Sequence, residues 1–307
     1  MSPMGSTIFV LGAAGQLGAA LLADPHASSA EVKPLTSADI DIADASSVAD
    51  ALSGLRSGDV VLNCAAYTDV DGAESDSARA FAVNRDGPGN LARATRAAGA
   101  WLITISTDYV FSGAAATEQA PRRDTPYQPD DVSGTPETVY GASKLAGEQL
   151  ALESDPTATV VRTAWVYTGG PTSRDFVGTM RRLEAERDTL TVVDDQTGSP
   201  TYAVDLAAGL WELVRRGPGE GTSGAVLHAT NAGSVTWYTV AREVFAEVGA
   251  DPDRVHPCTT ADFPRPAPRP AYSVLSGDSW ASAGLTPLRD WRMALHAAVN
   301  LDHAAVD

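Results

Sequence analysis

Short strand-like segments alternate with amphipathic segments along the first half of this chain. Segments rich in apolar and β-branched residues occur at 7–11, near 32–35, and at 59–63, 101–105 and 158–167. Helical segments lie between them, near 19–22, 73–84 and 87–98 and from Tyr140 onward. This repeated order predicts an α/β fold of the Rossmann type, in which a doubly wound parallel sheet carries helices on both faces.

The pattern becomes less regular beyond Thr168. Helices are predicted at 176–186, 204–215 and 236–248, and short strands at 190–193 and 226–228. We expect a dinucleotide-binding domain over residues 1–168, to which segments near 195–232 return. A smaller, mixed α/β C-terminal domain over residues 169–307 would mainly bind the substrate.

Two segments have an unusual composition. Residues 114–138 are rich in Pro, Asp, Thr and Gln, and a loop of this length either forms part of a site or is disordered. The proline-rich segment 263–270 is unsuited to a helix or a central strand. Its Arg265 and Arg269 are suited to phosphates, and a plain extended linker is an equal alternative.

Composition and charge narrow the choice of partners. The chain has 307 residues and a formal net charge of −17, which argues against nucleic acid or an anionic membrane surface. No apolar run reaches the roughly 18 residues of a membrane helix, and Met1 to Ser6 has no signal-peptide pattern, so we expect a cytoplasmic protein. The chain has two cysteines, Cys64 and Cys258, which are too few and too far apart in sequence for a disulfide scaffold, so we expect a reducing compartment. The five histidines show no metal-ligand spacing, so no metal is expected.

A glycine-rich turn directly follows the first predicted strand and leads into a helix. Its sequence, at 12–18, is GAAGQLG. Glycines allow a pyrophosphate to approach the backbone closely, and the free amides at the helix start bind its charge. The segment therefore predicts a dinucleotide site formed by Gly12, Gly15, Gln16, Leu17 and Gly18.

Two other strand ends contribute to the same prediction. The second strand ends at Thr36-Ser37, and these neutral hydroxyls tolerate both NADPH and NADH. The third strand continues into a loop of small residues that includes Ala65 and Ala66, followed by Tyr67. Small residues at the carboxyl end of a parallel strand let a cofactor lie close to the backbone.

The sequence YGASK at 140–144 places a tyrosine and a lysine one turn apart on one helix face. A nearby ammonium favours the phenolate, so we expect Lys144 to lower the pKa of Tyr140 from its usual value of about 10 and make it a usable proton donor. The chain has only one other lysine, Lys33, although it has 22 basic residues. A lysine in this background suggests a site that requires a compact charge.

The fourth strand delivers Ser106 and Thr107 to the same edge of the sheet. The Thr107 hydroxyl can hydrogen-bond a carbonyl oxygen and stabilise charge that develops on it. Taken alone, Thr107 would be interpreted as a helix or turn cap. Trp165, near the end of the fifth strand, could be a core residue or a wall for a sugar ring.

These motifs resemble those of the extended short-chain dehydrogenase/reductase superfamily and, within it, the dTDP-4-dehydrorhamnose reductase family of the actinobacterial kind. The matching segments run nearly end to end: GAAGQLG at 12–18, DIDIAD at 39–44, VLNCAAYTDVDGAE at 61–74, STDYVFSG at 106–113, YGASKLAGE at 140–148, RTAWVYTGG at 162–170, DDQTGSPTY at 194–202 and PRPAPRPAYSVLS at 264–276. Their order along the chain makes the resemblance specific.

The resemblance implies reduction of the C4 carbonyl of dTDP-4-dehydro-L-rhamnose by NADPH or NADH, the last step of dTDP-L-rhamnose biosynthesis. It assigns catalysis to Thr107, Tyr140 and Lys144, with Lys144 also holding the cofactor ribose. The remaining contacts that it implies are the sugar at Tyr109 and Trp165, adenine at Asp41 and Ile42, and the nucleotide sugar near Ala65, Ala66 and Val70. We infer a role for Arg269 at the diphosphate or in the domain core.

Three alternatives are considered. A sugar-nucleotide 4,6-dehydratase or epimerase is disfavoured because the second acid expected of dehydratases is missing, since Tyr109 follows Asp108. A 4-ketoreductase for another dTDP-4-keto-deoxysugar remains open. So does a non-catalytic, cofactor-binding regulatory subunit. The expected partner is a dTDP-sugar, and a homodimer is also open.

Overall fold

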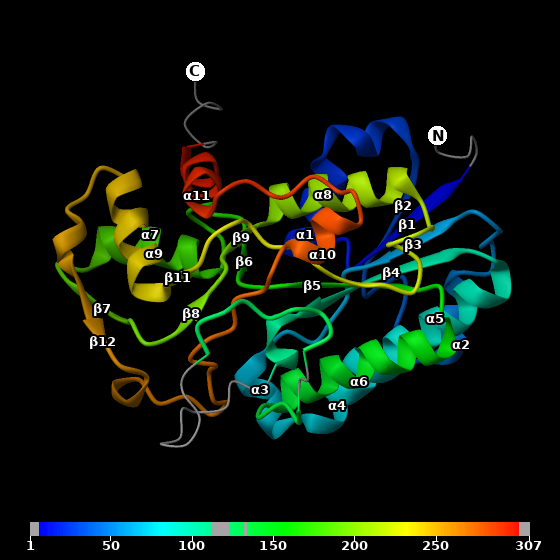
Figure 1. The fold of residues 1–307 in the computed structure, drawn as a ribbon, viewed down its shortest axis with the longest axis horizontal. Helices are drawn as coiled ribbons and strands as arrows, with labels where there is room; N and C mark the ends of the chain where they lie inside the picture. Colours follow the sequence, from blue (N-terminus) through cyan, green and yellow to red (C-terminus); the bar gives the residue numbers. More distant parts are fainter. Residues whose placement is uncertain (1–5, 112–122, 132–133, 301–307) are drawn as a thin grey trace.

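A six-stranded parallel sheet between two layers of helices forms the larger part of the molecule (Figure 1). The computed structural model describes residues 6–111, 123–131 and 134–300. The strand order β10-β5-β4-β3-β1-β2 reverses beside β1, where open parallel sheets bind ligands. The strands are β1 (Thr7–Leu11), β2 (Glu31–Leu35), β3 (Val60–Asn63), β4 (Trp101–Thr107), β5 (Thr159–Thr163) and β10 (Val226–His228). The α/β fold predicted from the sequence is confirmed.

The sheet is covered on both faces because alternate strand residues point to opposite helix layers. In β1, Ile8 and Val10 pack in the first layer's cluster, and Phe9 and Leu11 pack in the second layer's cluster. The first layer holds α1 (Gln16–Ala23), α8 (Ala203–Arg216) and α10 (Asp278–Ser282), and the second holds α2 (Ala45–Ala51), α5 (Gly87–Ala98) and α6 (Val139–Ser154). Figure 1 shows the first layer above the sheet and the second below it.

A second, smaller core lies at the other end of the molecule, at the left in Figure 1. Its helices are α7 (Phe176–Glu186), α9 (Trp237–Glu247) and α11 (Trp291–Asn300). Three two-stranded pairs accompany them: β7 (Leu190–Val193) with β12 (Val255–Cys258), β6 (Val166–Tyr167) with β9 (Thr201–Tyr202), and β8 (Thr197–Gly198) with β11 (Val235–Thr236). The predicted division of the chain at residue 168 remains a prediction.

Two of the predicted elements are divided in the structure. The strand expected at 158–167 ends at Thr163, because Trp165 adopts a φ of 48° that no strand accommodates, and β6 then pairs outside the large sheet. The helix expected at 73–84 consists of α3 (Val70–Ser75) and α4 (Ser77–Phe81), followed by a π-helical turn. Asp76 separates the two helices because its side chain caps the second one.

The regular elements that were not predicted include α2, β12, α10 and α11. The β12 sequence contains Pro257, and α10 has only five residues. The signal for α11 was present, because Trp291, Ala294, Leu295 and Ala298 recur at helical spacing and are all buried.

Part of the composition-biased loop at 114–138 falls outside the described residues, namely 114–122, 132 and 133. Within 123–131, the Tyr127 amide donates to the Val274 carbonyl (2.8 Å) and the Tyr127 carbonyl accepts from the Ser276 amide (2.9 Å). This segment therefore lies against residues 274–276.

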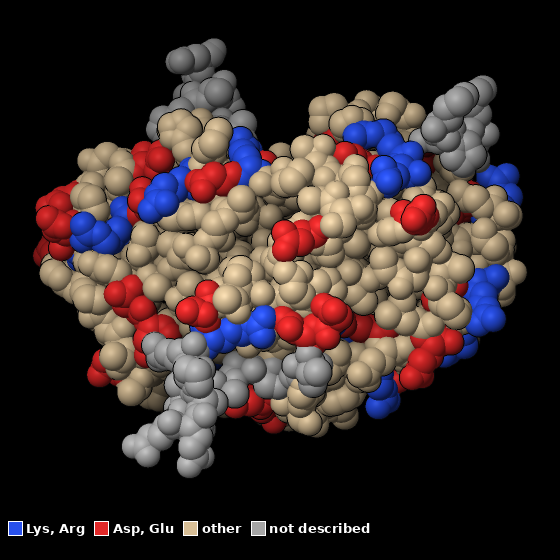
Figure 2. Space-filling model, viewed as in Figure 1, with Lys and Arg blue, Asp and Glu red and all other residues tan. Residues whose placement is uncertain are grey.

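Charged side chains of both signs are dispersed over one face of the molecule. On the face shown in Figure 2, Asp and Glu side chains are interspersed with Lys and Arg rather than gathered in one wide patch of a single sign. Within the ranges that the structure describes, no helix combines the length and the apolar character that crossing a membrane requires.

Candidate active site

A cleft of about 1290 Å³ lies at the carboxyl ends of the central strands and extends to α7 and α9. Every residue that the sequence assigned to catalysis, cofactor or substrate, from Gly12 to Arg269, lines this cleft. The structure thus brings all the predicted site residues together, while their individual roles remain predictions.

The glycine-rich turn is closely packed against the neighbouring strand end. Gly12 has a φ of 71°, and a Cβ there would lie 2.7 Å from the Ala65 nitrogen. A Cβ at Gly18 would lie 2.3 Å from the Gly12 carbonyl oxygen. The N-cap of α1 is Gly15, which provides no side-chain cap, so the first amides of the helix are available to the cleft. This cradle fits the pyrophosphate of a dinucleotide.

The tip of β2 presents hydroxyl groups to the cleft. Thr36 and Ser37 both line it. The Asp39 carboxylate folds back, accepting hydrogen bonds from the Thr36 amide (2.8 Å) and hydroxyl (2.7 Å). These hydrogen bonds lower the pKa of Asp39 below its usual value. The Asp39 carboxylate thus lies beside the Thr36 hydroxyl at this tip without lining the cleft, and the choice between NADPH and NADH stays open.

Three side chains from β4 and α6 form the candidate catalytic group. Thr107 is the last residue of β4, and its Oγ1 accepts from the Tyr109 amide (3.2 Å) and donates to Asp108 Oδ1 (3.0 Å). Tyr140 lies in the first turn of α6 and lines the same cleft as Thr107. Lys144 follows one turn later, and its Nζ donates to the Ile105 carbonyl (2.6 Å).

The electrostatics of Tyr140 differ from the sequence-based expectation. Burial raises the pKa of Tyr140 to about 12, although the hydrogen bond with Thr107 acts in the opposite direction. The expected lowering by Lys144 is absent from this arrangement, because the ammonium is directed to the Ile105 carbonyl. Tyr140 is consequently protonated at neutral pH, which is the form that can donate a proton.

Two neighbouring groups titrate closer to neutral pH. Burial lowers the pKa of Lys144 to about 8, and the charge of Glu148 opposes that shift. Burial also raises the pKa of Asp108 to about 6, although hydrogen bonds with Ser273 and Thr107 oppose it. Asp108 is 1% exposed and was considered in the sequence only as a contrast with dehydratases.

Aromatic side chains form the opposite part of the cleft. Tyr109 meets Tyr140 edge to face, with ring centroids 5.5 Å apart. Trp165 stacks on Trp237 at a centroid distance of 3.5 Å. A Cβ at Gly198 would lie 2.4 Å from the Trp165 ring, so this indole is enclosed on a second side. Trp165 is therefore a fixed wall of the cleft.

Trp237 and Arg174 also line the cleft, and the sequence analysis missed both. Trp237 begins a predicted helix, but only the tertiary fold brings it beside Trp165. Arg174 precedes α7 and is exposed at the cleft. No local motif distinguished it from the other arginines.

Arg269 is held by an aspartate from the first half of the chain. Its Nη2 lies 3.0 Å from Asp71 Oδ2, and Arg265 Nη2 lies 2.8 Å from the same oxygen. The Ala267 amide donates to the other oxygen of this carboxylate (3.2 Å). The proline-rich segment is thus docked on α3, with Arg269 at the cleft wall.

No cluster of three or more His, Cys, Asp or Glu residues in the described ranges is arranged to hold a metal ion.

Comparisons with known proteins agree with this geometry. Residues 6–303 match the family described as RmlD substrate binding domain. A dTDP-4-dehydrorhamnose reductase of Mycobacterium tuberculosis is 53% identical over 299 residues, 97% of this chain and 94% of the relative. A probable dTDP-4,6-dihydroxy-2-methyloxan-3-one 4-ketoreductase of Streptomyces antibioticus is 47% identical, over 94% of this chain and 93% of the relative.

The chain is also similar to a relative whose structure was solved with a bound cofactor. The dTDP-4-dehydrorhamnose reductase of Bacillus anthracis, in complex with NADP, is 33% identical and superposes with a TM-score of 0.81. The match covers 95% of this chain and 98% of that one.

Proposed function

The chain belongs to the RmlD substrate binding domain family, and we propose that it reduces the C4 carbonyl of dTDP-4-dehydro-L-rhamnose to dTDP-L-rhamnose. The observation that carries this proposal is the convergence of Thr107, Tyr140 and Lys144 on the cleft that also contains the glycine-rich turn. A proton donor beside a dinucleotide cradle is the arrangement that carbonyl reduction requires.

The glycine-rich turn and the start of α1 would bind the pyrophosphate of NADPH or NADH, with Lys144 close to its nicotinamide ribose. When bound, the cofactor supplies the hydride that reduces C4. Asp41 and Ile42 line the cleft at the place proposed for adenine.

Tyr140 would donate its phenolic proton to the C4 oxygen as negative charge develops there. With a pKa of about 12, Tyr140 carries its phenolic proton at neutral pH. The Thr107 hydroxyl, which lines the same cleft as Tyr140, would bind the same substrate oxygen. General acid catalysis of this kind accelerates a reaction by about 10² to 10⁴.

The substrate would lie between the catalytic group and the aromatic wall. Tyr109 and Trp165 are placed to contact the sugar, and Val70 to contact the nucleotide part. Arg269 is placed near the diphosphate, although its ion pair with Asp71 also gives it a structural role.

The test is oxidation of NADPH, and separately of NADH, followed at 340 nm with dTDP-4-dehydro-L-rhamnose, with the product identified by NMR. Turnover to dTDP-L-rhamnose is the expected result, and the two rates establish the cofactor preference. Cofactor binding without turnover would contradict this substrate and lead first to other keto sugars and then to a regulatory role.

A second candidate is a 4-ketoreductase for a different dTDP-4-keto-deoxysugar, and the similarity to the Streptomyces antibioticus ketoreductase favours it. It predicts the same cofactor and proton donor. A competition assay with both keto sugars discriminates between them, because the native substrate will have the higher kcat/KM. A cytoplasmic location, a homodimer and the absence of nucleic-acid binding remain predictions.

A further inference from the structure

A buried ion pair lies on the sheet side of the candidate catalytic helix. Arg162 Nε lies 2.9 Å from Glu148 Oε1, and Arg162 Nη2 lies 2.7 Å from Glu148 Oε2. The two residues are 5% and 4% exposed. The desolvation of such a pair offsets most of its attraction, so added stability alone is a weak reason for its presence.

The position of the pair connects it to the proposed reaction. Glu148 follows Lys144 by one turn on the same buried face of α6. Arg162 lies opposite Ser106 in the β4–β5 register. Ser106 directly follows Ile105, whose carbonyl accepts the Lys144 hydrogen bond, and directly precedes Thr107. The carboxylate therefore contacts one buried cation, Arg162, and belongs to a residue one helix turn from the other, Lys144.

Of the described groups that shift the pKa of Lys144, only Glu148 is negatively charged at neutral pH. Burial raises the pKa of Cys64, at the end of β3, so that its thiol is neutral. Tyr140 is also neutral. Asp108, beside Thr107, is not among the groups that shift the pKa of Lys144. Glu148 is the charge that opposes the burial of the ammonium.

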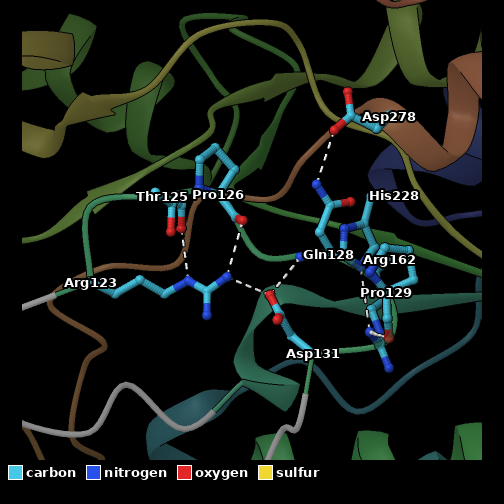
Figure 3. Close-up of polar contacts among 9 residues, drawn as sticks. All are labelled: Arg123, Thr125, Pro126, Gln128, Pro129, Asp131, Arg162, His228 and Asp278. Carbon is cyan, nitrogen blue, oxygen red and sulfur yellow. Dashed lines mark hydrogen bonds and ion pairs between the residues drawn. The ribbon is translucent and has the colours of Figure 1, made fainter.

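Arg162 is itself fixed on its far side (Figure 3). Its Nη1 donates to the Pro129 carbonyl (3.1 Å) and lies 3.4 Å from His228 Nε2. Burial and the charge of Arg162 lower the pKa of His228 to about 3, so this imidazole is neutral. The Arg162 guanidinium also lies over the Phe111 ring, 5.0 Å from the centroid. These contacts hold the guanidinium, and through it the Glu148 carboxylate, in one place.

We propose that Glu148, fixed by Arg162, is a positioning residue that keeps the Lys144 ammonium charged and in place at the cleft. The role in reduction rests on the function proposed above. The effect on the ammonium does not, because it follows from the buried charges alone.

The sequence offers a direct test that needs no substrate. Lys33 and Lys144 are the only lysines, so NMR of protein labelled with ¹³C in lysine gives two side-chain signals, assigned by Lys33→Arg. We expect Glu148→Gln to lower the titration midpoint of Lys144 by about one pH unit, because one cation then faces another without the carboxylate. The double variant Glu148→Gln/Arg162→Gln should restore part of the shift, because it removes the repelling charge.

Controls separate this electrostatic effect from damage to the fold. Glu153→Gln removes an exposed carboxylate from the same helix and should leave the midpoint unchanged. Glu148→Asp retains the charge and should keep the midpoint near that of the unchanged protein. Thermal unfolding of every variant identifies those that have lost stability. A Lys144 midpoint that is the same in folded Glu148→Gln as in the unchanged protein would overturn the proposal.

Kinetics then test the role in the reaction. The loss of kcat/KM at high pH should begin about one pH unit lower in Glu148→Gln, in step with Lys144. If the NMR midpoint moves while the pH profile only drops uniformly, the positioning role is wrong although the electrostatic effect stands. If the unchanged protein does not turn over the sugar, the proposed function fails, and the NMR series still decides the effect on Lys144.

Discussion

The two ends of the cleft are built in different ways. At the glycine-rich end the surface is mainly backbone, and its shape depends on Gly12 and Gly18 packing closely against adjacent segments. At the opposite end the surface is made of large side chains, such as Trp165 on Trp237. Arg269 there pairs with Asp71, 198 residues away in sequence. The glycine-rich turn itself is thus encoded in one contiguous motif, although it packs against Ala65, whereas the second end arises only when distant segments fold together.

The catalytic group lies between these ends, and its removal should have the largest effect. Tyr140→Phe removes the proposed proton donor and keeps the ring that meets Tyr109 edge to face. We expect kcat to fall by about 10² to 10⁴, while the affinity for NADPH, followed by fluorescence titration, stays unchanged. Activity close to that of the unchanged protein would show that another group donates the proton.

The glycine-rich end should tolerate almost no added volume. In Gly18→Ala the new methyl group would lie 2.3 Å from the Gly12 carbonyl oxygen, so the turn has to shift. We expect a loss of about 1–3 kcal/mol in the free energy of unfolding by denaturant. We also expect the affinity for NADPH to fall about tenfold, because the movement of the turn displaces the backbone amides proposed to bind the cofactor, and tenfold corresponds to about 1.4 kcal/mol.

Gly54→Ala is the matched control, because no atom lies within 4 Å of a Cβ built there. It should leave cofactor affinity unchanged. If Gly18→Ala binds NADPH as tightly as Gly54→Ala does, the tight turn is not what forms the cofactor site.

The contrast between the two ends also explains what the sequence could predict. The strand, glycine turn and helix at 7–23 are local, so their pattern reveals both structure and chemistry. Tyr140 and Lys144 share one helix turn and were found in the same way. Trp237 has no local signature, and its place beside Trp165 depends on the positive φ that ends the fifth strand. The expected lowering of the Tyr140 pKa failed for a similar reason, since burial is a property of the whole fold.

The aromatic end should respond to side-chain loss with a smaller and more selective effect. Trp237→Ala removes the ring on which Trp165 stacks, so Trp165 is free to leave its place in the wall. Aromatic pairs contribute about 0.5–1.5 kcal/mol, so we expect the KM for the sugar nucleotide to rise by about tenfold at most. The KM for NADPH should not change, and Trp237→Phe should retain most of the sugar affinity. An equal rise in both KM values would mean that the two ends are not independent.

The smallest effect is expected where the proline-rich segment docks on α3. Asp71→Asn weakens the contacts to Arg265 and Arg269, and because the Asp71 side chain is 22% exposed we expect a loss of only about 1 kcal/mol in the free energy of unfolding at pH 7. The pKa of Asp71 is below its usual value. Burial raises it, but hydrogen bonds from Arg269 and Ala267 and the charges of both arginines together lower it by more. A carboxyl group whose pKa is lower in the folded state stabilises above the unfolded pKa of about 4 and loses this contribution as the pH falls. The difference in the free energy of unfolding between Asp71→Asn and the unchanged protein should therefore shrink below about pH 4.

Asp253→Asn is the control, because this carboxylate, paired with Arg242, is 80% exposed, and the substitution should cost little stability at any pH. A difference for Asp71→Asn that persists undiminished at low pH would show that Asp71 acts through its shape and not through its charge.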